Sequence, residues 1–424
     1  MQNNKNFNLS KLFLLYFILY LTLLLSLYFG ENTTGGASYD FKIISRIIIS
    51  FAGDLKNTYR DFYTLSISHF PYYYIFLSFF YNDYFNFLLI KIVILHLSLF
   101  LPFVFFKIIK LKYDGINNYL ILIPGIFFLS PSFRTSAAWG FNDNIALIFF
   151  SLSIFYFIKF FNTKIIKKKN IFLILNIFFL ALASYVRQYY AIFIVFYLYK
   201  IYQQKQFRIL LLYIFFAIIF SLQAIIDTFV NNFTYSFNFI QVNIINSFLI
   251  FLTIFIIYLI PIYFEKKNIL NLIKFYKENK IILLILLFIV IFSYYFFDYG
   301  RVDKNTVLNY GGGYVYNVLN ILKLKYLFFP AAYISFLIIF HFTYLNFKNN
   351  FLITIILTVF IPLPVLYQKY FDPLSLILIF CLYENNLINN FINNLKTNIK
   401  FLYLYFVTIY LGTLFYYTLP GNTL

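Results

Sequence analysis

The sequence has little of what soluble proteins use to build sites and surfaces. Its 424 residues include one cysteine, one tryptophan and three histidines, and only 11% of them are charged. The single cysteine, Cys381, excludes an intramolecular disulfide scaffold. The scattered histidines show no spacing typical of a zinc site. No glycine-rich loop follows a strand pattern, so nothing indicates a soluble nucleotide cofactor.

The chain is instead rich in apolar side chains: 62% of its residues are hydrophobic, 25% are aromatic, and the mean hydropathy is +0.82. A soluble domain is about 45–50% apolar and about 25% charged. Surface-to-volume scaling prevents a folded soluble chain from hiding this much apolar surface. The composition therefore excludes a soluble enzyme, and it also excludes a disordered chain. It indicates a protein whose solvent is mostly lipid.

The apolar residues fall into runs that fit transmembrane helices. A bilayer core about 30 Å thick needs about 20 apolar residues per helix. The first run, Leu12–Phe29, is too long for a signal-peptide core, so we expect a retained helix. The other runs cover roughly 85–106, 118–133, 144–161, 171–186, 188–202, 209–226, 241–264, 281–297, 326–343, 351–366, 373–383 and 401–418. We predict an all-α, polytopic transmembrane helix bundle of about 13 spans, forming a single integral-membrane domain over residues 1–424.

Most of the positive charge lies on one side of the membrane if the short run Phe70–Tyr81 lies at the interface without crossing. With the N-terminus cytoplasmic, the inside loops then hold 21 basic and four acidic residues of a chain with net charge +19. The remainder holds 12 basic and 10 acidic residues. The positive-inside rule favours this orientation. The lysines are thus topology signals that face lipid, and no nucleic-acid partner is expected.

The first extracytoplasmic loop, residues 30–84, holds residues that the compositional bias toward Phe, Ile, Asn and Lys does not explain. Asp40 precedes two short amphipathic pieces, about 41–51 and 54–66, which predict juxtamembrane helices. His69-Phe70-Pro71-Tyr72-Tyr73 then opens the interfacial helix. A structural reading also exists here, because Asp40 could cap the first of these helices and Pro71 could start the helix that follows it.

Three further charges, Arg134, Asp143 and Arg187, lie at the outer edges of apolar spans. A charge near hydrocarbon costs about 2–3 kcal/mol or more unless it is paired or faces water, so each is a candidate for function. The structural alternative is snorkelling to the interface, which Arg187 could do from a helix end.

The pattern resembles the GT-C class of integral-membrane glycosyltransferases. Those enzymes have an early acidic residue in the first outer loop, a His-Pro-Pro-Leu-Tyr-like start to a juxtamembrane helix, and a later Pro…Asp stretch. Asp40, His69-Phe70-Pro71-Tyr72-Tyr73 and Pro131…Asp143 occupy those places, with Phe70 as a departure from the usual proline. Within the class, Ser130–Phe150 and Tyr185-Val186-Arg187-Gln188 look like the alpha-1,2-glucosyltransferase of the dolichol-linked oligosaccharide, whose Phe-Arg-Gln-Thr-Asn motif would place its Arg-Gln on Arg187 and Gln188.

That second likeness has limits. Tyr189 and Tyr190 stand where the family has Thr and Asn, and its long cytoplasmic loop is missing. The likeness covers a GT-C-like core of about residues 1–210 and leaves the C-terminal helices 211–424 outside.

The resemblance implies transfer of a sugar, a hexose or pentose, from a polyprenyl-phosphate donor at the extracytoplasmic membrane face. The acceptor would be a glycan, lipid or protein, with membrane lipids as surroundings. A bacterial inner membrane fits better than the endoplasmic reticulum. The implied catalytic residues are Asp40 and Asp143; the implied substrate-binding residues are Arg187, Gln188, His69, Tyr72, Arg134 and Lys369. No cofactor is certain, and a carboxylate-bound Mg²⁺ or Mn²⁺ stays open.

Two other classes compete with this hypothesis. A transporter or flippase of lipid-linked sugars would have paired inverted halves and ionisable residues deep within spans. A non-catalytic partner or ligase of surface-polysaccharide assembly would depend on a large outer loop late in the chain. Here the charges gather at one face and the rich outer loop comes first.

Overall fold

The computed structural model describes residues 9–62, 69–85, 87–113, 118–229, 244–298, 312–359 and 366–418, and among them it has helices and turns but no strand. The first half contains α1 (Leu9–Phe29), α2 (Ala37–Gly53), α3 (Leu55–Asp61), α4 (Tyr72–Ser78), α5 (Leu88–Ser98), α6 (Phe100–Lys112), η2 (Asn118–Leu129), α7 (Pro131–Trp139), α8 (Asp143–Asn162), α9 (Ile166–Val186), η3 (Gln188–Ile192), α10 (Phe193–Gln203) and α11 (Phe207–Phe229). The second half contains α12 (Ile244–Tyr263), α13 (Lys266–Glu278), α14 (Lys280–Phe296), α16 (Gly313–Ile321), η5 (Lys325–Leu327), α17 (Phe328–Tyr344), α18 (Phe347–Val359), η6 (Gln368–Tyr370), α19 (Leu374–Cys381), α20 (Asn386–Asn393) and α21 (Leu395–Thr418). The all-α, multi-pass membrane architecture is confirmed.

The count of about 13 spans is not confirmed. In the described residues, eight helices are long and apolar enough to cross a membrane, and three further helix pairs are bent by 64°, 92° and 91°, which gives up to 11 spans. The run 118–133 bends where η2 meets α7, because Pro131 cannot donate the backbone bond that would continue a helix. The run 188–202 is divided between η3 and the 11-residue α10. Apolar composition alone does not reveal such breaks.

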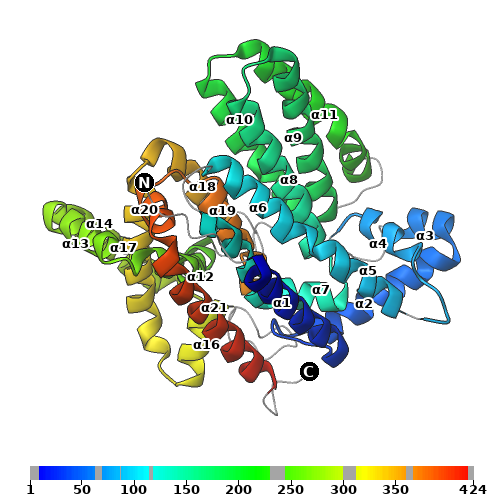
Figure 1. Cartoon of the computed structure of the whole chain (residues 1–424), viewed down its shortest axis with the longest axis horizontal. Coiled ribbons are helices and arrows are strands. Elements are labelled where there is room, and N and C mark those ends of the chain that lie inside the picture. Colours follow the sequence, from blue (N-terminus) through cyan, green and yellow to red (C-terminus); the bar gives the residue numbers. More distant parts are fainter. Residues whose placement is uncertain are drawn as a thin grey trace.

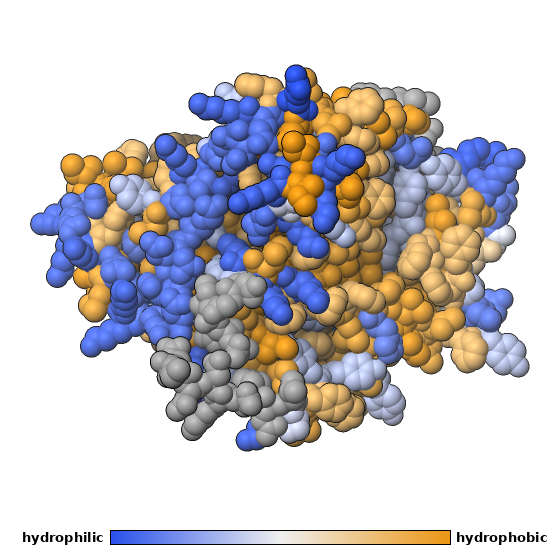
Figure 2. All heavy atoms as spheres, turned by 45° about the horizontal axis from the view of Figure 1, so that its top comes forward, coloured by the Kyte–Doolittle hydropathy of each residue, from blue (hydrophilic) through white to orange (hydrophobic). Residues whose placement is uncertain are grey.

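Spans differ in how deeply they lie in the bundle. α12 is central, with 78% of its apolar window buried inside the protein, whereas α11 is peripheral, with 6% buried. In Figure 1, α8, α9, α10 and α11 lie together at the top, α1 and α21 cross the centre, and α2 to α5 lie at the right. Figure 2 shows broad apolar areas on the surface beside hydrophilic ones. Exposed side chains such as Phe13, Phe288 and Leu211 fit contact with lipid.

The helix bundle has two ends with different side chains. At one, which we call the lysine end, Lys112 donates to the carbonyls of Cys381 and Tyr383 at 3.1 and 2.7 Å, and Lys200 pairs with Glu384 at 2.9 Å. α8 and α9 are packed antiparallel, running from Asp143 away to this end and back to Val186. The start of α8 and the end of α9 therefore meet at the other end, where the candidate site lies.

Candidate functional site

The turn between α7 and α8 fixes Asp143. Gly140 directly follows α7, and its φ of 73° is left-handed and suits glycine. The Gly140 carbonyl accepts a hydrogen bond from the hydroxyl of Tyr73 on α4, at 2.7 Å. Asp143 then begins α8, where a carboxylate is favoured by the positive end of the helix dipole.

Arg187 directly follows α9 and pairs with Asp143. Asn142 donates to the carbonyl of Val186 at 3.3 Å and so joins the two helix ends. Nη2 of Arg187 lies 2.8 Å from Oδ1 of Asp143, and the side chains are only 11% and 16% exposed. Burial by itself would lower the pKa of Arg187, but the negative charge of Asp143 outweighs it and raises this pKa. The guanidinium therefore stays charged.

His69 and Gln188 extend this pair. Nη1 of Arg187 lies 2.7 Å from Nε2 of His69, and arginine has only donors, so Nε2 must accept. The His69 ring then carries its proton on Nδ1, which lies 3.4 Å from Oε1 of Gln188. Two buried donors, Nε of Arg187 and Nε2 of Gln188, have no hydrogen-bond partner among the described residues. Buried donors without partners are costly, and such groups at a cleft indicate a site for a ligand rich in acceptors.

A second ion pair joins Asp40 to Lys369. Asp40 lies in the first turn of α2, and Nζ of Lys369 lies 3.0 Å from its Oδ2. The short helix η6 carries Lys369 and is fixed on both sides. Gln368 donates to the hydroxyl of Tyr258 at 2.9 Å, and Asp372 accepts from the backbone N–H of Ser132 at 3.1 Å.

The charges of both ion pairs act on two tyrosines. Burial raises the pKa of Tyr74 on α4 to about 12, and the charges of Arg187, Asp143 and Asp40 all act on this hydroxyl. Tyr370 is likewise within electrostatic range of these three residues and of Lys369. The structure thus brings six residues of the predicted site to one end of the bundle: Asp40, Lys369, Asp143, Arg187, His69 and Gln188.

Arg134 lies elsewhere. Its side chain is 3% exposed and its guanidinium is surrounded by acceptors of the protein: Nη2 lies 2.8 Å from Glu31 and also donates to Ser26, and Nη1 donates to Thr22 and to the carbonyl of Phe128. Burial would raise the pKa of Glu31, but the hydrogen bonds and charge of Arg134 outweigh it, so this pKa is lowered. Because these donors are directed to acceptors of the protein and not to a ligand, the geometry does not support the predicted substrate-binding role of Arg134.

Tyr72 also points away from the two pairs. Its hydroxyl donates to Asp227 on α11, which is fully buried and also accepts from Gln223 at 3.0 Å. Burial raises the pKa of Tyr72 strongly, and the Asp227 carboxylate raises it further. The contact ties α4 to α11 beside the candidate site.

Sequence reasoning missed Glu31, Tyr74, Asp227 and Tyr370. Asp227 carries the same signal as Asp143, a lone carboxylate at the end of an apolar run, and could have been found by it. Glu31 follows a span directly. Tyr74 and Tyr370 had no signal of their own in a chain with 42 tyrosines.

No group of three or more His, Cys, Asp or Glu side chains gathers as a metal site in the described part of the chain. Asp40 and Asp143 each face a cation instead. A carboxylate-bound Mg²⁺ or Mn²⁺ stays a prediction.

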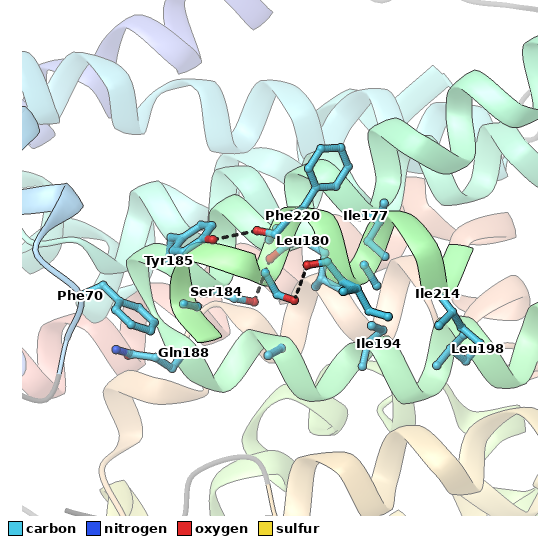
Figure 3. A pocket seen from close by; sticks show the side chains of 16 residues that line it. Phe70, Ile177, Leu180, Ser184, Tyr185, Gln188, Ile194, Leu198, Ile214 and Phe220 are labelled. Atoms are coloured by element: carbon cyan, nitrogen blue, oxygen red, sulfur yellow. Dashed lines mark hydrogen bonds between the residues drawn. The ribbon is translucent and has the colours of Figure 1, made fainter. Parts of the chain in front are cut away.

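An apolar groove begins at this site. A cavity of about 490 Å³ lies between α9, α10 and α11, with Phe70, Tyr185 and Gln188 at one end and Leu198 and Ile214 at the other (Figure 3). We call it the α9/α11 groove. The rise of a helix from Gln188 to Leu198 makes it roughly 15 Å long. Its walls are almost wholly aliphatic and aromatic, and Gln188 with its unpartnered donor lies at the head.

No family model, no curated protein and no solved structure matches this chain. The GT-C resemblance therefore rests on the motifs around Asp40, His69 and Asp143 alone.

Proposed function

We propose that the protein transfers a sugar from a polyprenyl-phosphate donor to an acceptor hydroxyl at the extracytoplasmic face of a membrane. One observation carries the proposal: Gln188, whose buried Nε2 has no partner among the described residues, lines the head of an apolar groove, and the preceding residue, Arg187, has a buried Nε without a partner as well. Such a site suits a ligand with a charged head and a long hydrocarbon tail. A phosphate on an isoprenoid chain has both.

The two ion pairs suit the two halves of the reaction. Asp40, 39% exposed, takes the proton of the acceptor hydroxyl as its oxygen attacks the anomeric carbon. The bond from that carbon to the phosphate oxygen breaks, and polyprenyl phosphate leaves. Arg187 stabilises the charge that develops on the phosphate, because its planar fork matches phosphate oxygens. Asp143 and His69 hold this guanidinium in place.

Attack from the side opposite the phosphate inverts the anomeric centre. Lys369 is placed to serve both halves, since it contacts Asp40 and lies within range of Asp143. Charges gathered at one end favour this chemistry over transport, which needs a route through the middle of the bilayer.

The first test replaces Arg187 with lysine in purified protein reconstituted with lipid-linked sugar donors. Lysine keeps the charge beside Asp143, so the fold is expected to survive, but it loses the fork. We expect transfer to fall about 10- to 100-fold. Arg46→Lys, on the exposed face of α2, is the matched control and should change nothing. Full activity of the Arg187→Lys variant would assign the phosphate to another cation.

The second test fills the groove. Ala217 lines it from α11, and Ala217→Phe is expected to occupy the space of the donor tail. We expect KM for a long-chain donor to rise about tenfold, with little change for a short-chain analogue, because only the long tail needs the groove. Ile219→Phe, on the same helix but outside the groove and 39% exposed, is the control. Equal effects on both donors would contradict the assignment.

A further inference from the structure

A second cavity, of about 1160 Å³, lies between α1, α7 and α21, on different helices from the α9/α11 groove. We call it the α1/α21 cavity. Its outer wall includes Leu25 and Phe29 of α1 and Leu411 and Phe415 of α21, all of them exposed on the protein surface. Phe29 and Phe415 are 75% and 67% exposed. Because both helices are candidate spans, the cavity opens sideways toward lipid.

The floor of the cavity is polar but offers no free cation. It is formed by Glu31 and Arg134 with the hydroxyl of Tyr410, which donates to Glu31 at 3.0 Å. The ion pair is balanced in charge, and the donors of Arg134 are directed to acceptors of the protein. The described residues that line the cavity include no lysine and no second arginine. This floor suits an uncharged head rich in hydroxyl groups and does not suit a phosphate.

The α1/α21 cavity also leads toward the proposed catalytic residue, Asp40. Ser38 lines it from α2, two residues before Asp40. Tyr417 lines it as well and also lines a small pocket that Lys369 shares. The cavity thus approaches the Asp40–Lys369 pair, whereas the α9/α11 groove approaches Arg187 and Gln188.

We infer that the α1/α21 cavity binds the acceptor, and that the acceptor is a membrane amphiphile with an uncharged, hydroxyl-rich head. Its apolar part lies between α1 and α21, and its head reaches past Glu31 and Tyr410 to Asp40. This inference rests on the proposed sugar transfer. It assigns a lipid-anchored acceptor in place of a soluble glycan or a protein, a choice that the proposed reaction alone leaves open.

The single tryptophan of the chain, Trp139, lines this cavity and makes binding measurable without any turnover. The protein is placed in phosphatidylcholine vesicles that contain increasing mole fractions of a glucosyl diacylglycerol with brominated acyl chains. Bromine quenches tryptophan on contact. We expect saturable quenching, with half-saturation at a mole fraction at least fivefold lower than for phosphatidylcholine with the same brominated chains. Equal quenching by the two lipids would overturn the inference.

A substitution in the floor of the α1/α21 cavity tests how the head group of the amphiphile is recognised. Tyr410→Phe removes one hydroxyl from the cavity, so half-saturation is expected to shift about fivefold, the size of one hydrogen bond. Tyr405→Phe is the matched control, because Tyr405 lies on the same helix but donates to the carbonyl of Ile257 at 2.9 Å, away from the cavity. An identical response of the two variants would contradict a head bound at Tyr410.

Failure of the inference and failure of the proposed function give different results. If brominated glycolipid does not bind selectively while sugar still moves from the lipid-linked donor to a soluble acceptor, the acceptor inference falls and the transferase stands. If the glycolipid binds selectively but no lipid-linked sugar is consumed, the transferase proposal falls, and with it the role of the glycolipid as acceptor.

Discussion

Replacing Asp40 with asparagine is expected to lower the rate of sugar transfer about 10²- to 10⁴-fold, the range in which a positioned general base contributes. Asparagine has almost the same shape, and its amide oxygen can still accept from Lys369, which lies 3.0 Å from Oδ2 of Asp40. The loss should therefore appear in kcat, with folding and donor binding retained. The measurement is the initial rate with reconstituted protein at saturating donor.

The control for this prediction makes the same chemical change elsewhere in the segment that follows α1. Asp61 is 59% exposed and pairs with its neighbour Arg60, so Asp61→Asn should keep full activity. If Asp40→Asn retains more than about a third of the wild-type rate, Asp40 is not the base. Asp143→Asn then becomes the decisive variant, because Asp143 is the carboxylate of the other ion pair at this site.

The sequence was enough to predict an all-α membrane protein and to indicate which charged residues share one face. Both predictions follow from the apolar runs and the charges of the loops. It also indicated which residues go against the composition. It did not predict the partners. Lys369 meets Asp40 across 329 residues, and nothing local to either one indicates that contact.

Arg134 and Arg187 show the same limit most clearly. Both stand at the edge of an apolar span and carry the same signal in the sequence. In the fold, Arg134 is surrounded by acceptors of α1 and Glu31, whereas Arg187 keeps an unpartnered Nε beside an apolar groove. The difference depends on packing between distant helices. The span count failed for a similar reason, since a bend such as that between η2 and α7 leaves the apolar composition unchanged.

Breaking the ion pair between Glu31 and Arg134 is the other change expected to have a large effect, here on stability. Arg134→Met leaves the Glu31 carboxylate buried without its cation, which costs about 3–5 kcal/mol of unfolding free energy. Glu31→Leu leaves the guanidinium in the same position. The double variant removes both charges and should recover much of the loss, so the two effects are far from additive. Unfolding in mixed micelles, followed by circular dichroism, measures all four proteins.

Acid should remove the same contribution from the wild type. The pKa of Glu31 is lowered in the fold from its ordinary value of 4.5, so its contribution is fully present above that value. It is lost as the pH falls through the lowered pKa of the folded protein. The double variant has no such group and should lose less stability over this range. If both proteins lose stability equally between pH 5 and the acid limit of the measurement, the acid sensitivity belongs to other carboxylates and the pair contributes little. Since this pair also forms the floor of the α1/α21 cavity, a stable double variant would separate its structural role from any role in binding.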